Sequence, residues 1–99
     1  MKDYIILNQN HLPVDNGQVE YFDEIGAVQQ YLQRIGKSDY IAEDANSGGK
    51  PLKYGMTLYV LERDQYSNEE ISHFMKRKLM KRFFARPPTE ARRYARRRK

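Results

Sequence analysis

The chain has 99 residues, of which 18 are Lys or Arg and 13 are Asp or Glu, so its formal net charge is +5 at neutral pH. This length predicts one small domain that is too small for a deep active-site cavity. Cysteine is absent, which excludes disulfides and thiolate metal sites, and we expect neither a metal nor a cofactor.

The first 22 residues predict two strands joined by a tight turn. Tyr4 to Leu7 is a short apolar run, rich in strand-favouring side chains, and it is too short for a signal peptide or a membrane span. We therefore expect a soluble, cytoplasmic protein. The expected setting is a bacterium or a virus-infected cell, with the nucleoid or an organelle as alternative locations. Asn16-Gly17 tolerates the positive φ angles of a hairpin turn. Gln18 to Phe22 alternates in polarity, with Val19 and Tyr21 on one side of the expected strand.

A helix is predicted from Asp23 to Ile35. Asp23 suits the N-cap position because its carboxylate can accept hydrogen bonds from amides of the first turn. Gly36 allows the left-handed turn that closes many helices. An apolar stripe at helical spacing should lie on a sheet and consists of Ile25, Val28, Leu32 and Ile35.

Two further strands and a loop are predicted next. Tyr40 to Ala42 predicts a short strand, and the polar, Gly-rich segment Glu43 to Lys53 predicts a loop that lacks the spacing of a phosphate-binding P-loop. Met56 to Glu62 predicts a strand with two apolar faces, which we place in the centre of the sheet and covered on both sides. Tyr59 within it is interpreted as a core or sheet-surface residue.

The last third predicts a long amphipathic helix and a basic tail. Ser67 to Glu70 matches a capping box, and the helix should end at about Ala85, because Pro87-Pro88 forces a break. Thr89 to Lys99 should be disordered until phosphates neutralise its arginines. The inner stripe of the helix is expected to consist of Ile71, Met75, Leu79 and Phe83.

These elements predict an α+β fold with a mainly antiparallel sheet of three or four strands. The helix from Asp23 to Ile35 should cover one face, and the long basic helix should pack on the other face or on an edge. The expected organisation is a small acidic βα domain over residues 1–66, an amphipathic basic helix over 67–86, and an Arg-rich tail over 87–99.

The charge is strongly divided along the chain. Residues 67–99 carry twelve Lys and Arg against three Glu, a net of +9, whereas residues 1–66 carry six against ten, a net of −4. Charge this concentrated indicates a polyanionic partner, and arginine suits phosphate because its planar fork binds in a bidentate manner. Phe84 and Tyr94 can add stacking on bases. The predicted nucleic-acid-binding residues are Lys76, Arg77, Lys81, Arg82, Phe84, Arg86, Arg92, Arg93, Tyr94, Arg96, Arg97, Arg98 and Lys99.

Residues 83–93, with the sequence FFARPPTEARR, resemble a segment of the bacterial small-subunit ribosomal protein number twenty-one. In that family a basic helix leads into this segment and on to a basic C-terminal helix packed on ribosomal RNA. The resemblance implies that RNA is preferred over DNA as the partner. Matched by position, Phe83, Phe84, Arg86 and Pro87 correspond to the bend, and Arg92, Arg93, Arg96 and Arg97 to the RNA-facing helix. The chain departs from the family in its 66 additional N-terminal residues and in lacking a Gly-containing joint.

No catalytic site is predicted. His11 and His73 have no motif around them, and no nucleophile–base arrangement can be assembled. The main hypothesis is therefore non-catalytic binding of RNA in a ribosome or another ribonucleoprotein, by tail ordering on phosphate and helix docking through Arg77, Lys81 and Phe84. One alternative is a small regulator of a virus-encoded type that inhibits a host nucleic-acid-processing protein. Another is a structural subunit of a ribonucleoprotein or a virion.

Overall fold

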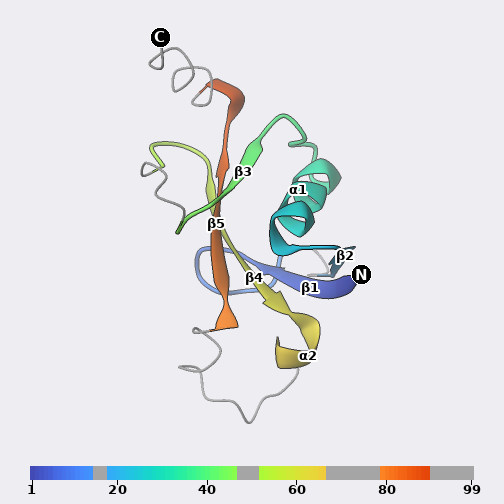
Figure 1. Ribbon diagram of the computed structural model, residues 1–99. Coiled ribbons are helices and arrows are strands. Elements are labelled where there is room, and N and C mark those ends of the chain that lie inside the picture. Colours follow the sequence, from blue (N-terminus) through green and yellow to red (C-terminus); the bar gives the residue numbers. More distant parts are fainter. Residues whose placement is uncertain (15–17, 47–51, 67–78, 90–99) are drawn as a thin grey trace.

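The fold is α+β: a curled, five-stranded antiparallel sheet with a helix, α1, on one face (Figure 1). The computed structural model describes residues 1–14, 18–46, 52–66 and 79–89. The strand order across the sheet is β2-β1-β4-β5-β3. The elements are β1 (Lys2–Leu7), β2 (Val19–Tyr21), α1 (Glu24–Arg34), β3 (Ile41–Asp44), β4 (Met56–Glu62), α2 (Arg63–Tyr66) and β5 (Lys81–Arg86).

The predicted strands before residue 63 are confirmed, except that β3 continues through Glu43 and Asp44, which were predicted to begin a loop. β4 has the predicted bounds and is the central strand of the sheet, with β1 on one side and β5 on the other. Leu61 is buried on the face of β4 away from α1, whereas Thr57 and Tyr59 on that face stay partly exposed. The prediction that both faces of β4 are covered is therefore confirmed only near Leu61, at the C-terminal end of the strand. The Asn16-Gly17 turn lies outside the described residues.

The predicted helix is confirmed with its two end signals. The Oδ1 atom of Asp23 accepts a hydrogen bond from the amide of Gly26 at 2.8 Å, and Gly36 takes a left-handed conformation with φ +77°. The predicted inward stripe is wrong at its first position, because Ile25 is 41% exposed. Val28 and Leu32 of that stripe are buried as predicted, and Ala27 and Tyr31 are buried beside them.

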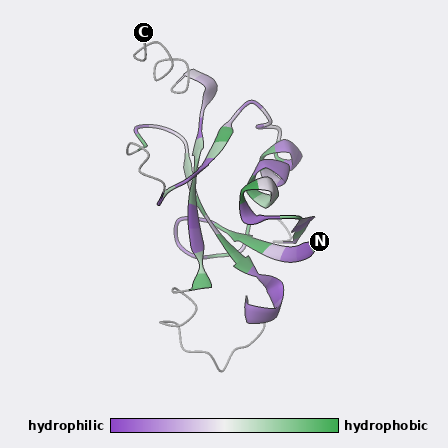
Figure 2. Cartoon of the chain, viewed as in Figure 1, coloured by the Kyte–Doolittle hydropathy of each residue, from purple (hydrophilic) through white to green (hydrophobic). Residues whose placement is uncertain are grey.

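The core lies between α1 and the sheet. Strand alternation turns every second residue toward the helix, and these residues form one cluster that includes Tyr4, Ile6, Leu58, Val60 and Phe83. The hydrophobic residues of β1 and β4 stand out against the more hydrophilic α1 and β5 (Figure 2). Burial of apolar area of this kind is the main favourable term in folding.

The edge strand β3 is tied to α1 as well as to β5. The Nε2 atom of Gln29 donates to the carbonyl of Tyr40 at 3.1 Å, and its Oε1 atom accepts from the amide of Ala42 at 3.4 Å. One half-buried amide side chain thus satisfies two backbone groups at the start of the strand, as buried polar groups generally require.

The predicted long helix is wrong at its C-terminal end, where residues 81–86 form strand β5. This strand pairs with β4 on one side, with Leu58 opposite Phe83, and with β3 on the other, with Ala42 opposite Ala85. In a helix, the backbone N–H and C=O groups of this segment would bond to one another. In β5 they bond instead to the backbones of the two neighbouring strands. The prolines at 87–88 therefore end a strand, and the sheet has five strands rather than three or four. Residues 67–78 lie outside the described residues.

The expected division of the chain changes with β5. Because β3 joins the sheet through β5, residues 1–66 do not contain a continuous sheet on their own. Residues 81–86 are thus an internal part of the fold, and not of a helix appended to an acidic domain. The expected disordered tail lies outside the description from residue 90 onward.

Alkaline pH is expected to destabilise the fold through Tyr4. This side chain is 1% exposed, and burial, together with the nearby negative charge of Glu24, raises the pKa of its phenol above the ordinary 10.0. A raised pKa means that the folded state holds the proton more tightly than the unfolded state, so its contribution is complete below about pH 10 and is lost as pH rises further. Chemical denaturation between pH 8 and pH 11 should show a steeper loss of stability for the natural chain than for Tyr4→Phe. Equal slopes would contradict the prediction.

Candidate nucleic-acid interface

Strand β5 places its own basic and aromatic residues on two faces of the sheet. Phe83 and Ala85 point toward α1 and are buried, at 3% and 0% exposure. Because successive residues of a strand point to opposite faces, Arg82, Phe84 and Arg86 lie on the other face. We call this the open face.

Four of the thirteen predicted binding residues are described by the structure: Lys81, Arg82, Phe84 and Arg86. The other nine lie outside the described residues, and their predicted role stays a prediction. They are Lys76, Arg77, Arg92, Arg93, Tyr94, Arg96, Arg97, Arg98 and Lys99.

The prediction that Lys81 and Phe84 dock together on one side of a helix is wrong. Residues three apart share one side of a helix but lie on opposite faces of a strand. Lys81 lies on the α1 face, where its Nζ atom is 3.4 Å from Oε1 of Glu24 in the first turn of α1. Its side chain is 58% exposed, so this is a surface ion pair. Arg77, the third residue of the predicted docking set, lies outside the described residues.

Arg82 and Phe84 are neighbours on the open face. Arg82 is exposed and Phe84 is half-buried, and the guanidinium carbon of Arg82 lies 5.6 Å from the centre of the Phe84 ring. This distance fits a cation–π contact, in which the ring face attracts the positive charge. The pair joins a cation that suits phosphate to an aromatic ring that suits a base.

Arg86 shares the open face but is held by the protein. Its side chain is 7% exposed, and its Nε atom donates to Oε1 of Glu43 on β3 at 2.7 Å. Its guanidinium carbon also lies 6.0 Å from the centre of the Phe84 ring. Arg82 and Arg86 thus contact the same ring from two residues before it and two residues after it in the strand. Arg86 therefore joins β5 to β3 and helps to fix the ring of Phe84.

Sequence reasoning did not find two further aromatic residues of the open face, Tyr59 and His11. Tyr59 of β4 pairs with Arg82 of β5 in the sheet register. Its ring lies 4.5 Å from the ring of His11, centre to centre, at an interplanar angle of 57°. The alternation of side chains along Met56–Glu62 already placed Tyr59 on the face opposite to Leu58, but no local pattern indicated that β5 lies beside Tyr59.

The loop after β1 places His11 against Tyr59. The Oδ1 atom of Asn8 accepts hydrogen bonds from the amides of Asn10 and Leu12, at 2.8 and 3.1 Å. His11 between them has φ +62°, a left-handed conformation that non-glycine residues adopt uncommonly. Hydrogen bonds from the backbone to the Asn8 side chain, which are common in turns, thus fix the backbone of the loop that carries His11.

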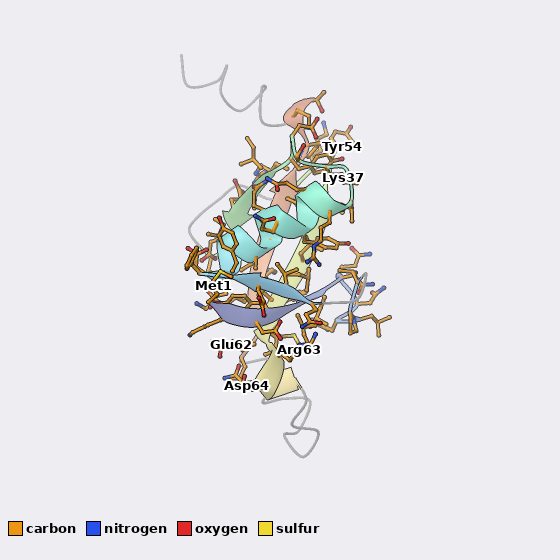
Figure 3. All side chains as sticks on the ribbon, turned by 90° about the vertical axis from the view of Figure 1, so that its right-hand side faces the viewer. Met1, Lys37, Tyr54, Glu62, Arg63 and Asp64 are labelled. Atoms are coloured by element: carbon orange, nitrogen blue, oxygen red, sulfur yellow. The ribbon has the colours of Figure 1, made fainter. Side chains whose placement is uncertain are left out.

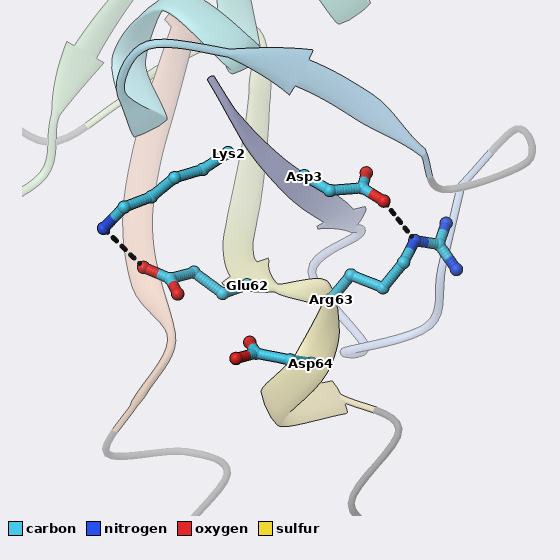
Figure 4. Close-up of a pocket in the computed structure, with 5 residues that line it drawn as sticks. All are labelled: Lys2, Asp3, Glu62, Arg63 and Asp64. Carbon is cyan, nitrogen blue, oxygen red and sulfur yellow. Dashed lines mark hydrogen bonds and ion pairs between the residues drawn. The ribbon is translucent and has the colours of Figure 1, made fainter.

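A second site lies at the end of β4, where a hollow of about 380 Å³ is lined by Lys2, Asp3, Glu62, Arg63 and Asp64 (Figure 4). It is at the opposite end of the molecule from Lys37 and Tyr54 (Figure 3). Lys2 Nζ is 3.1 Å from Glu62 Oε1, and Arg63 Nε is 2.9 Å from Asp3 Oδ2. The contact with Glu62 raises the pKa of Lys2 above its ordinary value. Because both cations of this hollow are paired with carboxylates, it does not favour phosphate.

Comparison with protein-family models, curated proteins and solved structures found no match to this chain. The ribosomal resemblance of residues 83–93 therefore stays a prediction. Residues 81–86, which cover the end of the helix implied before this segment and the start of the segment itself, form strand β5.

Across the described ranges, no three His, Asp or Glu side chains are grouped closely enough to hold a metal ion. In the same part of the chain, no helix is long and apolar enough to cross a membrane.

Proposed function

We propose that this protein is a non-catalytic nucleic-acid-binding protein that prefers RNA and holds phosphates with its C-terminal third. The observation that carries the proposal is the division of charge, +9 over residues 67–99 against −4 over residues 1–66. Concentrated Lys and Arg neutralise phosphates and release condensed counterions, and this release is the main source of nonspecific nucleic-acid affinity. The preference for RNA rests on the C-terminal resemblance.

The structure supports this proposal at Arg82 and Phe84. The exposed cation and the aromatic ring lie side by side on the open face, 5.6 Å apart, and β5 leads directly into the last residues of the chain. From Thr89 to Lys99 the sequence holds six Lys and Arg against one Glu. A ligand on the open face would thus have a dense source of positive charge joined to the same strand.

A salt series tests the proposal. The full chain is titrated with a structured RNA and with duplex DNA of equal length at several salt concentrations. Each phosphate contact should contribute about −0.7 to −0.9 to the slope of log affinity against log salt. Removal of Thr89–Lys99, with its six cations, should lower the magnitude of the slope by up to about 4 to 5.

Two outcomes would contradict the proposal. If the full chain binds RNA no better than about millimolar at 150 mM salt, weaker than typical nonspecific binding, the charge serves another purpose. If the chain without Thr89–Lys99 keeps its affinity and its salt dependence, the C-terminal segment is not the phosphate grip, and a protein partner becomes the better explanation.

A further inference from the structure

We propose that the open face binds single-stranded RNA by stacking unpaired bases on Phe84 and Tyr59, with Arg82 beside both rings to contact phosphate. This inference rests on the proposed function, since it names the form of nucleic acid that the site takes. It goes beyond binding through phosphate contacts alone, because such contacts do not read the bases and so do not distinguish unpaired bases from paired ones.

The sheet register places the three residues together. Tyr59 pairs with Arg82, and Phe84 pairs with Thr57, across adjacent strands β4 and β5. Tyr59 and Phe84 are therefore diagonal neighbours on one face, at a typical separation of about 7–8 Å, with Arg82 directly beside both. The side chains that alternate with them, Leu58 and Phe83, are in the core and fix which face each ring takes.

Both rings are held in place by neighbouring groups. The guanidinium carbons of Arg82 and Arg86 lie 5.6 and 6.0 Å from the centre of the Phe84 ring, and the ring of Tyr59 contacts the ring of His11. Rings that are already ordered lose less conformational freedom on binding than free ones, so more of the stacking energy appears as affinity.

The spacing favours a single strand over a duplex. A separation of about 7–8 Å is roughly twice the 3.4 Å rise between stacked nucleotides, so successive bases would reach the two rings only when splayed apart. Unstacked bases of this kind occur in loops, bulges and single strands, and proteins recognise them by stacking on aromatic side chains. A duplex presents phosphates to such a face and gains nothing from the rings.

The charge on this face suits a polyanion. Glu43 is the acidic residue of β3 that shares the face, and its carboxylate is held by Arg86 at 2.7 Å. The other acidic residue of that strand, Asp44, pairs with Phe83 and so lies on the α1 side of the sheet. Arg82 is left exposed beside the two rings and adds a positive charge where a phosphate would pass.

The test measures the affinity of the chain for three ligands of equal length at one salt concentration. The ligands are a uridine oligonucleotide, an RNA duplex, and an abasic oligonucleotide with the same backbone. The natural chain should bind the uridine oligonucleotide more tightly than the abasic one. Phe84→Leu should lower the affinity for uridine by roughly 5- to 150-fold, the range for loss of stacking on one base, and should leave the affinity for the abasic strand unchanged. Phe84→Tyr keeps the ring and should keep the affinity.

Phe22→Leu is the matched control. Phe22 is 74% exposed and follows β2, which is separated from β5 by β1 and β4, so its loss should change none of the three affinities. Equal binding of all three ligands by the natural chain would overturn the stacking proposal and leave the phosphate grip standing. Equal loss of uridine and abasic binding in Phe84→Leu would also overturn it. Failure to bind any of the three would overturn the proposed function itself.

Discussion

Gly55→Ala is expected to destabilise the fold by about 3 kcal/mol or more, because the added methyl group would clash with β5 where it passes close to the start of β4. Gly55 precedes β4 and has φ +108°, a conformation that L side chains rarely adopt. A Cβ atom added there would lie 2.3 Å from the backbone oxygen of Ala85 and 3.0 Å from Cδ of Pro87. Backbone cannot move aside as a flexible side chain can, so β5 itself would have to shift. Thermal unfolding should show a midpoint lowered by about 12 to 24 °C.

Gly36→Ala is the control for this experiment. Gly36 also has positive φ, at +77°, but an added Cβ atom there meets nothing within 4 Å. It should cost only the backbone penalty of about 1–2 kcal/mol. The excess cost at Gly55 then measures the contact with β5. Equal costs for the two substitutions would argue that residues 85–87 do not lie against Gly55, and would favour the helix that the sequence predicts there.

The elements that the sequence predicted correctly have several local signals that agree. The helix Glu24–Arg34 has a capping Asp before it and a Gly after it, and the strand Met56–Glu62 is an apolar run too short for a helix. Residues 79–86 lack such agreement. Leu79 and Phe83 are four apart, as on a helix, whereas Phe83 and Ala85 are two apart, as on a strand. Lys and Arg favour helices and Phe favours strands, so propensity does not decide.

What decides the structure of residues 81–86 is non-local. β4 and β3 both border this segment and supply hydrogen-bonding partners, and neither neighbour is visible in the pattern of the segment itself. The same error changed the predicted site. A helical period groups Lys81 with Phe84, whereas the strand period groups Arg82 with Phe84 and sends Lys81 to Glu24. The composition of the site could thus be predicted from sequence, but its geometry depends on the sheet.

The contrast between Arg82 and Arg86 gives the second large expected effect. The two residues lie on the same strand and the same face, but Arg86 is 6% exposed and paired to Glu43, whereas Arg82 is exposed. Arg86→Met keeps much of the aliphatic stem and leaves the Glu43 carboxylate without this partner. Loss of one member of a fully buried pair costs about 3–5 kcal/mol. Because the Glu43 side chain is 30% exposed, water can solvate part of its charge, and we expect about 2–3 kcal/mol.

Arg82→Met removes the same charge from the same face and separates stability from binding. Its exposed side chain should contribute within about 0.5 kcal/mol to the free energy of unfolding, while its loss should weaken RNA binding and lower the magnitude of the salt slope by about 0.7 to 0.9. A double-mutant cycle completes the test, because Glu43→Gln in the Arg86→Met background should recover part of the lost stability. If the effects of Arg86→Met and Glu43→Gln on the free energy of unfolding simply add, the ion pair between Arg86 and Glu43 does not stabilise the contact between β3 and β5. If Arg82→Met destabilises the fold as much as Arg86→Met, then Arg82 serves the fold, and the open face loses its cation for phosphate.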